Sequence, residues 1–443
     1  MSEATERLST EEVARRLGVK RETVYAYVSR GLLERHPASG PHHSEFDPEE
    51  VERLAVRARR PDRSSALEVV VETELTLLEP EGRLSYRGRD AIELARFRSF
   101  EEVVALLWDG APPTPWGLDD ERTAAIEALG DALGPEAPAA ERIAAVVATL
   151  AARDPERDDR TADAVRRAGA EVFAATLAAL ARGRLNQPPA EGGRPKPPMA
   201  PVRTTADGGA PERTTAGRGG SAGIAARLWV ALADRDARPR PEQVAALNAA
   251  LILLADHELA ASTFAARVAA SAWAGPYRVI LAGLGPLGGA LHGSTGLAVE
   301  ALLDEVAAGA DPGARLDARI EAGGVPGFGH RVYRDRDPRA DHLLSLLGLP
   351  TRRPLSPPGL QSSTGAAAEA LLAAAAERGL PAPNVDFALA ALVKAHGLRD
   401  GSPPTIFTFA RIAGIIAHAL EEYEYRLRFR PRASYVGPTP PAS

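Results

Sequence analysis

Cysteine is absent from this chain of 443 residues, which excludes disulfide scaffolds, thiolate zinc sites, iron–sulfur clusters and cysteine nucleophiles. Lysine occurs only at Lys20, Lys196 and Lys394, so arginine supplies nearly all of the positive charge. Histidine is also scarce, with nine copies. Because histidine is the side chain that titrates near neutral pH, these nine positions are the first places to look for acid/base chemistry.

The chain also lacks an excess of positive charge, since 53 basic residues face 59 acidic ones and the formal net charge is −6. No overall field attracts nucleic acid or an anionic membrane, so any such contact has to be local. The most apolar stretches, residues 247–255 and 366–376, are shorter than the roughly 20 residues that span a membrane. Residues 1–6 show neither the basic start nor the apolar core of a signal peptide. We expect a soluble, cytoplasmic protein without a membrane partner.

Most of the chain is expected to fold, mainly into helices. Its length suggests about three compact units, and its 45% hydrophobic and 25% charged residues are ordinary for globular proteins. Apolar residues recur at helical spacing in ten segments: 99–108, 122–133, 140–152, 161–182, 222–233, 241–255, 297–308, 364–378, 385–396 and 405–424. Residues 75–87 predict a small β-hairpin with its turn at residues 80–82. The segment 187–220, which is rich in proline and glycine, is expected to be a flexible insertion.

The N-terminal residues predict two short helices joined by a turn. Ser9 or Thr10 caps the first helix, and residues 20–30 form a second helix that ends at Gly31. The segment resembles the helix-turn-helix of MerR-type and excisionase-type regulators, with residues 32–35 and 42–46 as a wing. This resemblance implies that the second helix contacts DNA, and the candidate side chains are those of Lys20, Arg21, Thr23, Tyr25, Tyr27 and Arg30.

Charge in this N-terminal module does not favour DNA strongly. Its acidic residues roughly balance the basic ones, so docking to another protein, or a relic module, is the alternative to DNA binding. His42 and His43 are expected on the surface of the wing, because no cysteine or further His/carboxylate cluster completes a metal site there.

Two histidines in the helical body lie in ambiguous surroundings. His257 belongs to an Asp-His-Glu run that interrupts an apolar helix, which is costly unless these polar groups are paired. His292 follows the glycine-rich residues 283–289, which would let the backbone approach a ligand closely. A buried histidine is also a common structural residue, and a glycine run also marks a simple helix-to-turn junction, so both interpretations stay open.

His330 and Asp386 carry more specific signals. The loop of residues 325–329, Val-Pro-Gly-Phe-Gly, presents His330 and several following arginines, a pattern that suits a polyanionic ligand. Asp386 lies between apolar neighbours, where burial would favour its neutral form and make it a plausible catalytic base.

The order and spacing of these motifs resemble the citrate synthase family. The resemblance covers about residues 75–443 apart from the insertion, and it is carried by Asp256-His257-Glu258, Leu291-His292-Gly293, Gly327-Phe328-Gly329-His330, Asp337-Pro338-Arg339, Asn384-Val385-Asp386-Phe387, Phe409-Ala410-Arg411 with His418, and Arg430-Pro431-Arg432. It implies a large helical domain of residues 66–295 and 401–443 and a small domain of residues 296–400, preceded by the helix-turn-helix module of residues 1–62. It also implies a homodimer or larger oligomer, no metal and no permanently bound cofactor.

The resemblance implies a role for each matched residue in condensing acetyl-CoA with oxaloacetate to citrate. Asp386 would remove a methyl proton from the thioester, His292 would stabilise the enol, and His330 would polarise the keto carbonyl. The dicarboxylate would be bound by His257, Arg339, Arg411 and Arg430, the last contributed by another subunit. CoA would be received by Val325, Pro326, Gly327, Phe328, Gly329 and Arg334.

Three positions depart from the family pattern. Ala260 stands where asparagine is usual, Ser294-Thr295-Gly296 where Gly-Ala-Asn is usual, and residues 388–390 where a Tyr-Ser pair is common. These changes make the pocket more apolar and bear on substrate choice and rate. One alternative is 2-methylcitrate synthesis from propionyl-CoA, since one methylene changes discrimination by only about 1–3 kcal/mol. The other is a DNA-binding regulator whose body senses oxaloacetate, citrate or CoA.

Overall fold

The computed structural model describes residues 70–111, 116–134, 137–185, 223–233, 238–289, 295–349 and 363–431, together with residues 7–17 and scattered positions between 24 and 51. The chain divides into two compact units, Met1–Glu72 and Thr73–Ser443. The predicted insertion at 187–220 lies outside the described residues.

The N-terminal unit combines one described helix with a small antiparallel sheet. Helix α1 is Thr10–Leu17, and strands β1 (Leu8–Ser9), β3 (Ser44–Phe46) and β2 (His36–Pro37) pair in that order. Ser9 caps α1, because its hydroxyl accepts from the Glu12 backbone N–H at 3.3 Å while its own backbone N–H donates to the Glu12 carboxylate at 2.8 Å. The predicted start of the first helix is therefore confirmed.

Buried apolar side chains hold this small unit together, among them Val13 of α1 and Phe46 of β3. Of the predicted second helix, residues 20–30, only Val24 and Val28 are described, and Val24 is buried in the same cluster. The six side chains expected to face DNA lie outside the described residues. Strand β3 coincides with the end of the predicted wing.

The second unit opens with a hairpin and continues as a helical body. Strands β4 (Thr76–Glu79), β5 (Arg83–Tyr86) and β6 (Arg89–Asp90) form an antiparallel sheet in sequence order, with Leu78 opposite Leu84. The turn contains Gly82 at φ +97°, a conformation that glycine adopts without strain, and the predicted hairpin is confirmed. The first helices that follow are α4 (Ala91–Phe97), α5 (Phe100–Leu107), α6 (Asp120–Leu133), α7 (Ala139–Arg153), α8 (Ala162–Leu185), α9 (Ile224–Leu232) and α10 (Pro241–Leu254).

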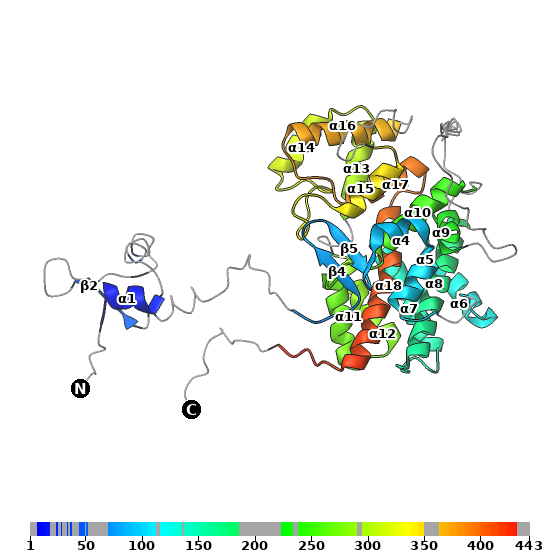
Figure 1. Cartoon of the computed structure of the whole chain (residues 1–443), viewed down its shortest axis with the longest axis horizontal. Coiled ribbons are helices and arrows are strands. Elements are labelled where there is room, and N and C mark those ends of the chain that lie inside the picture. Colours follow the sequence, from blue (N-terminus) through cyan, green and yellow to red (C-terminus); the bar gives the residue numbers. More distant parts are fainter. Residues whose placement is uncertain are drawn as a thin grey trace. The chain divides into compact units, whose positions relative to one another are not determined.

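The remaining helices carry most of the candidate site. They are α11 (Ala261–Ser271), α12 (Pro276–Leu287), α13 (Thr295–Ala307), α14 (Pro312–Glu321), α15 (Pro338–Leu346), α16 (Ser363–Glu377), α17 (Val385–His396) and α18 (Ser402–Tyr425). Figure 1 shows α13 to α17 gathered at one end of the unit and the other helices arranged around α18. The mainly helical fold is as predicted, whereas the division of this unit into a large and a small domain stays a prediction.

Helix α18 is the central core helix of the second unit. It packs against α7, α8, α10, α11 and α12. Among the described helices it is the one long and apolar enough to cross a membrane, yet 89% of its apolar window is buried inside the unit, as in the core helix of a globular protein. Trp108, which follows α5, donates from its indole N–H to the Ala413 carbonyl at 2.8 Å and so ties the hairpin side of the unit to α18.

All ten predicted helices are present, and the sequence analysis missed α4, α11, α12, α14 and α15. Helix α12 was missed because its glycines and Pro286 disfavour a helix. The structure gives Gly283 a packing reason: a Cβ there would lie 2.6 Å from Cδ1 of Ile415 on α18. That part of the glycine run serves close helix packing and not a ligand.

Candidate active site

The loop that carries His330 is paired with the segment that leads into Asp386. Gly329 donates its backbone N–H to Ala382 at 2.8 Å, and Asn384 donates its own to Gly327 at 2.9 Å. The Asn384 amide also donates to the Gly329 carbonyl at 2.9 Å. These bonds hold the His330 loop against the start of α17, where Asp386 lies in the first turn.

Glycine is required in this loop for a reason that the structure makes explicit. Gly327 has φ +85°, and a Cβ there would lie 2.8 Å from Val299 on α13 and 3.1 Å from Phe387 on α17. Both the backbone conformation and the space exclude a side chain. Phe328 packs on Phe387 with ring centroids 5.2 Å apart. The loop is therefore a rigid element shaped by α13 and α17.

His330 is held as a neutral ring with a defined tautomer. Its Nδ1 accepts backbone N–H bonds from Val332 at 3.1 Å and Tyr333 at 3.2 Å, so the proton of the neutral ring lies on Nε2. Burial, helped by the nearby charge of Arg339, lowers the pKa of His330 to about 4. At neutral pH the ring thus presents an N–H donor without a full positive charge.

Arg339 lies beside this donor and is fixed by a buried ion pair. Its Nε and Nη2 donate to Asp337 at 2.9 and 2.8 Å, and both side chains are almost fully buried. Asp337 caps α15 and also accepts the Val385 backbone N–H at 3.0 Å, which ties α15 to α17. Arg339 Nη2 lies 3.3 Å from Nε2 of His330. Two donors so close together suit one acceptor oxygen, such as that of a carbonyl or carboxylate.

Asp386 is half-buried, and its environment tunes it toward the role of a base. Burial raises the pKa of its carboxyl to about 6, against the opposing effect of the Arg339 charge. The Asn384 side chain accepts the backbone N–H of Asp386 at 3.0 Å and caps α17. A carboxylate with a raised pKa that is still ionised at pH 7 is suited to removing a proton.

Arg411 is a second buried guanidinium with spare hydrogen-bonding capacity. It lies on α18 and donates from Nε to the Leu254 carbonyl at 3.0 Å. Its Nη1 is buried and has no hydrogen-bond partner among the described residues. Burial lowers the pKa of Arg411, and the charge of Asp256 opposes that shift. A buried cation with an unused donor is suited to an anionic ligand.

His257 joins the same cluster through Tyr333. Its Nε2 lies 3.2 Å from the Tyr333 hydroxyl, and its ring centroid is 5.2 Å from that of His330. Tyr333 is 3% exposed and stacks obliquely on His330 at 4.6 Å. Five predicted residues therefore fall within one group linked by these contacts or by shared elements: His257, His330, Arg339, Asp386 and Arg411.

The other predicted site residues either have no described contact with this group or lie outside the described residues. His292 lies outside the described residues, in the gap at 290–294. Arg430 is exposed in the extended segment after α18. Arg334 lies 3.8 Å from Glu81 of the hairpin turn, and both side chains are largely exposed. Val325 and Pro326 are partly exposed at the start of the rigid loop.

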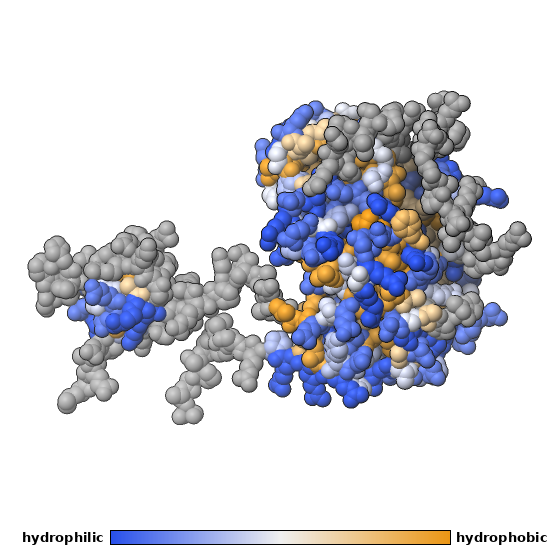
Figure 2. Space-filling view, in the orientation of Figure 1, coloured by the Kyte–Doolittle hydropathy of each residue, from blue (hydrophilic) through white to orange (hydrophobic). Residues whose placement is uncertain are grey.

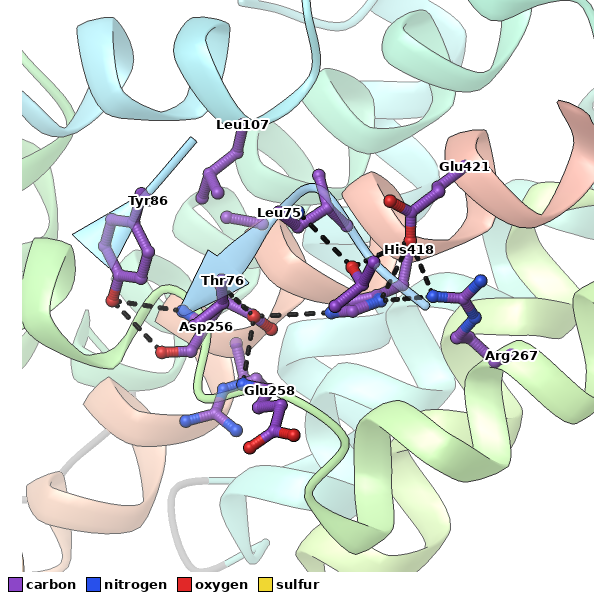
Figure 3. A network of polar contacts seen from close by, with 12 residues as sticks. Leu75, Thr76, Tyr86, Leu107, Asp256, Glu258, Arg267, His418 and Glu421 are labelled. Carbon is purple, nitrogen blue, oxygen red and sulfur yellow. Dashed lines mark hydrogen bonds and ion pairs between the residues drawn. The ribbon is translucent and has the colours of Figure 1, made fainter. Parts of the chain in front are cut away.

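Sequence reasoning missed the residues that support the site. Tyr333, three residues after His330, and Asp337, in the quoted Asp337-Pro338-Arg339 motif, were given no role, although Asp337 directly before Pro338 is a recognisable helix start. Asn384 was likewise quoted without a role. Asp256 was treated only as a neighbour of His257, yet Figure 3 shows it at the centre of a polar network that includes His418 and Arg267.

Two protein families and several known proteins match this chain. Residues 66–432 match the family Citrate synthase, C-terminal domain, and residues 8–58 match the MerR HTH family regulatory protein. The chain is 32% identical over 408 residues to citrate synthase of Haloferax volcanii, covering 83% of this chain and 94% of that protein. It is 38% identical over 201 residues to citrate synthase 2 of Bacillus subtilis, a match that spans about half of each protein, 45% and 53%.

Two further relatives bear on the reaction and on the fold. The 2-methylcitrate synthase of Mycobacterium tuberculosis is 28% identical over 398 residues, covering 85% of this chain and 91% of that protein. The solved structure of Thermoplasma acidophilum citrate synthase, a ternary complex with carboxymethyl coenzyme A and oxaloacetate, aligns with TM-score 0.61 and 26% identity. That alignment covers 85% of this chain and 96% of the other.

Proposed function

The chain belongs to the citrate synthase family, and from that premise we propose that it condenses acetyl-CoA with oxaloacetate and hydrolyses the product to citrate and CoA. The observation that carries the proposal is the pairing of a neutral histidine donor, His330 Nε2, with a guanidinium donor, Arg339 Nη2, 3.3 Å away. This pair is tied by Asp337 and Asn384 to the helix that bears Asp386. Donors that can polarise a carbonyl and a carboxylate that can act as a base are thus held on connected elements.

Asp386 and His330 enter the reaction in the protonation states described above. The Asp386 carboxylate takes a methyl proton from the thioester, and His292 stabilises the resulting enol by a hydrogen bond. The enol carbon then attacks the keto carbon of oxaloacetate, whose oxygen accepts a hydrogen bond from His330 Nε2–H. The new alkoxide takes this proton, and the proton held by Asp386 returns to His330, which restores the neutral ring and the carboxylate. Water then adds to the thioester carbonyl and its second proton goes to the leaving thiolate, which releases CoA.

The dicarboxylate is bound by the cationic side of the site. Arg339 and Arg411 supply guanidinium donors, and His257 supplies an imidazole beside Tyr333. Arg430 completes the clamp when contributed by a second copy of the chain. CoA is received by residues 325–329 and Arg334. The proposed reaction uses neither a metal nor a permanently bound cofactor.

A homodimer or larger oligomer is part of this proposal. Large apolar side chains remain partly exposed near the ends of α11 and α18, at Val268, Trp273, Tyr425 and Leu427, with exposed fractions of 37–42%. Figure 2 shows hydrophobic patches on the visible face, set among hydrophilic residues. A second copy would cover such side chains and bring its Arg430 close to the site. A cytoplasmic location is also part of the proposal.

Propionyl-CoA is the main alternative acyl donor. Ala260 caps α11 without any side-chain hydrogen bond, so the substrate side of this helix is less polar than an amide would make it. A pocket distinguishes one methylene only weakly, by about 1–3 kcal/mol. The relative named 2-methylcitrate synthase supports keeping this donor in the assay.

A second alternative is a DNA-binding regulator whose body senses oxaloacetate, citrate or CoA. The match of residues 8–58 to the MerR family favours it. Helix α1 carries exposed Arg15 and Arg16 in its last turn. In a mobility-shift assay on the DNA upstream of its own coding region, this alternative predicts binding that oxaloacetate alters and Arg30→Ala weakens. A shift that neither treatment changes would count against it.

The enzymatic proposal is tested by following free CoA from purified protein with oxaloacetate and either acetyl-CoA or propionyl-CoA. We expect release that requires both substrates, with acetyl-CoA the better donor. Asp386→Ala is expected to release CoA at least about 100-fold more slowly. Equal rates for the wild type and Asp386→Ala would end the enzymatic interpretation.

A further inference from the structure

A buried charged network beside the site has no role in the proposed chemistry (Figure 3). Arg267 of α11 donates to Glu421 at 2.6 Å and to Glu422 at 3.0 Å on α18. Its Nη1 also lies 3.3 Å from Nδ1 of His418, whose Nε2 lies 3.3 Å from Oδ2 of Asp256. Arg267, His418 and Asp256 are all 0% exposed. Burying so many charged groups costs desolvation free energy, so a contribution to stability alone does not explain the network.

The contacts determine which groups of this network donate hydrogen bonds and which accept them. Arg267 can only donate, so the Nδ1 of His418 accepts from it and the proton of the neutral ring lies on Nε2. His418 therefore donates to the Asp256 carboxylate. Asp256 also accepts from the Thr76 hydroxyl at 2.6 Å and from the Glu258 backbone N–H at 3.2 Å. Three donors fix one carboxylate oxygen, Oδ2, directly before His257 in the chain.

Helix α18 binds the segment before His257 in register. Arg411 donates to the Leu254 carbonyl at 3.0 Å, Gly414 donates its backbone N–H to the Ala255 carbonyl at 2.9 Å, and His418 reaches Asp256. The three α18 residues follow at i, i+3 and i+7, so they share one face of the helix. A Cβ at position 414 would collide with Asp256, so glycine allows this close approach.

This register links the two groups, Arg411 and His257, that would bind the dicarboxylate in the proposed function. Arg411 belongs to α18, and His257 follows the segment that α18 holds. Glu258 has φ +56°, a strained conformation for a residue other than glycine, and its backbone N–H is held by Asp256. The Asp256 and His418 side chains hold the strained turn, in addition to the bonds from Arg411 to Leu254 and from Gly414 to Ala255.

We propose that Asp256 and His418 are positioning residues for keto-acid binding: they hold His257 and Arg411 at the spacing that a dicarboxylate requires. The inference rests on the proposed function, because that function supplies the dicarboxylate. Neither residue touches the reacting atoms. Their loss therefore weakens oxaloacetate binding more than it changes the use of the acyl-CoA.

The test compares His418→Leu with His418→Gln. Glutamine can donate from Nε2 to Asp256 and accept from Arg267, whereas leucine can do neither. Tyr277→Phe is the matched control: the hydroxyl of the buried Tyr277 on α12 lies 2.9 Å from Asp154 and 3.0 Å from Glu171, in a polar network without a described contact to the site. Calorimetry gives the oxaloacetate Kd of folded protein, and steady-state kinetics give both KM values.

We expect His418→Leu to raise the oxaloacetate Kd and KM at least about tenfold, with the acyl-CoA KM changed less than about threefold. His418→Gln is expected to stay within about threefold of the wild type, and Tyr277→Phe to show no change in Kd. If His418→Leu does not fold, Asp256→Ala replaces it, because this change removes the acceptor of the bonds from His418, Thr76 and Glu258 and predicts the same Kd increase.

The proposal is overturned if His418→Leu binds oxaloacetate as tightly as Tyr277→Phe, or if glutamine and leucine weaken binding equally. Binding separates this result from the fate of the proposed function. If the wild type binds oxaloacetate but releases no CoA, the proposed condensation is wrong. The oxaloacetate Kd values of the variants then still decide whether Asp256 and His418 are positioning residues. A wild type that binds no oxaloacetate overturns both.

Discussion

Nε2 of His330 lies 3.3 Å from Nη2 of Arg339, and both nitrogens are hydrogen-bond donors at neutral pH. The backbone N–H groups of Val332 and Tyr333 occupy Nδ1 of His330, while Asp337 holds the guanidinium. The two donors are therefore held side by side by separate partners. An oxaloacetate oxygen placed between them would be polarised by a neutral and a charged donor together.

The first prediction concerns the geometry of Arg339. In Arg339→Lys the ammonium cannot make two parallel bonds to Asp337 and still reach the substrate, so the oxaloacetate KM is expected to rise about tenfold or more. Steady-state kinetics at saturating acyl-CoA measure it. Arg378→Lys is the control, because Arg378 also pairs with an aspartate, Asp317, at 2.7 and 2.9 Å but is partly exposed and has no described contact with the site residues. Equal KM values in the two variants would refute the prediction.

The second prediction concerns pH and Asp386. Because burial raises the pKa of this carboxyl to about 6, kcat/KM is expected to fall about tenfold per pH unit below pH 6. The neutral His330, with a pKa of about 4, should add no step between pH 6 and 8. A profile measured with acetyl-CoA from pH 5 to 8 decides the matter, and a midpoint at the ordinary aspartate pKa would contradict the assignment.

Stability gives an independent view of the same residue. The folded pKa of Asp386 lies above the unfolded one, so the folded state holds its proton longer and loses stability as pH rises from about 4 to 6. Asp386→Asn removes this cost, and we expect the inactive variant to be about 1–3 kcal/mol more stable than the wild type at pH 7. Urea unfolding at pH 4 and pH 7 measures it. A variant that is less stable at pH 7 would be inconsistent with this account.

A further prediction separates space from backbone conformation in the His330 loop. Gly327→Ala introduces a Cβ 2.8 Å from Val299, so we expect it to cost about 2–4 kcal/mol of stability and to lower kcat. Gly88→Ala is the matched control, because Gly88 has a similar φ, +73°, and no atom within 4 Å of its would-be Cβ. It should cost only about 1–2 kcal/mol. If both variants lose the same stability, the contact with Val299 is not the cause.

The last stability prediction concerns Glu300, a carboxyl on α13 that is 4% exposed and accepts the backbone N–H of Gly401 at 2.9 Å, just before α18. Burial raises its pKa to about 7. The folded state therefore binds its proton more tightly than the unfolded one, and the stability lost between pH 4.5 and 7 is about 2–3 kcal/mol. Glu300→Gln should flatten this part of the pH–stability curve. An unchanged slope would show that another group titrates there.

Local sequence signals predicted a large part of the fold. Helices with steady apolar spacing, such as α8 and α17, were found, and so was the hairpin around Gly82. Helix α12 was missed because Gly283 follows a tertiary demand, the approach of Ile415, that no local pattern displays. At such positions tertiary packing overrides the low intrinsic helix propensity of glycine.

Five residues of the candidate site were named from the sequence, whereas the residues that support them were not. His330 and Asp386 stand in recognisable motifs, whereas the bond from Arg411 to Leu254 joins residues 157 positions apart. The tautomer of His330 depends on two backbone N–H groups, and the role of Tyr333 depends on its distance to His257. These are properties of the folded chain, and residue identity alone does not determine them.

The most direct test of the central claim is to identify the product by mass spectrometry. Wild-type protein is incubated with oxaloacetate and equal amounts of acetyl-CoA and propionyl-CoA, beside Asp386→Ala at the same concentration. The account predicts citrate as the main product, in amounts equal to the CoA released from acetyl-CoA, and almost none with Asp386→Ala. No product from the wild type, or citrate formed equally by the variant, would contradict it.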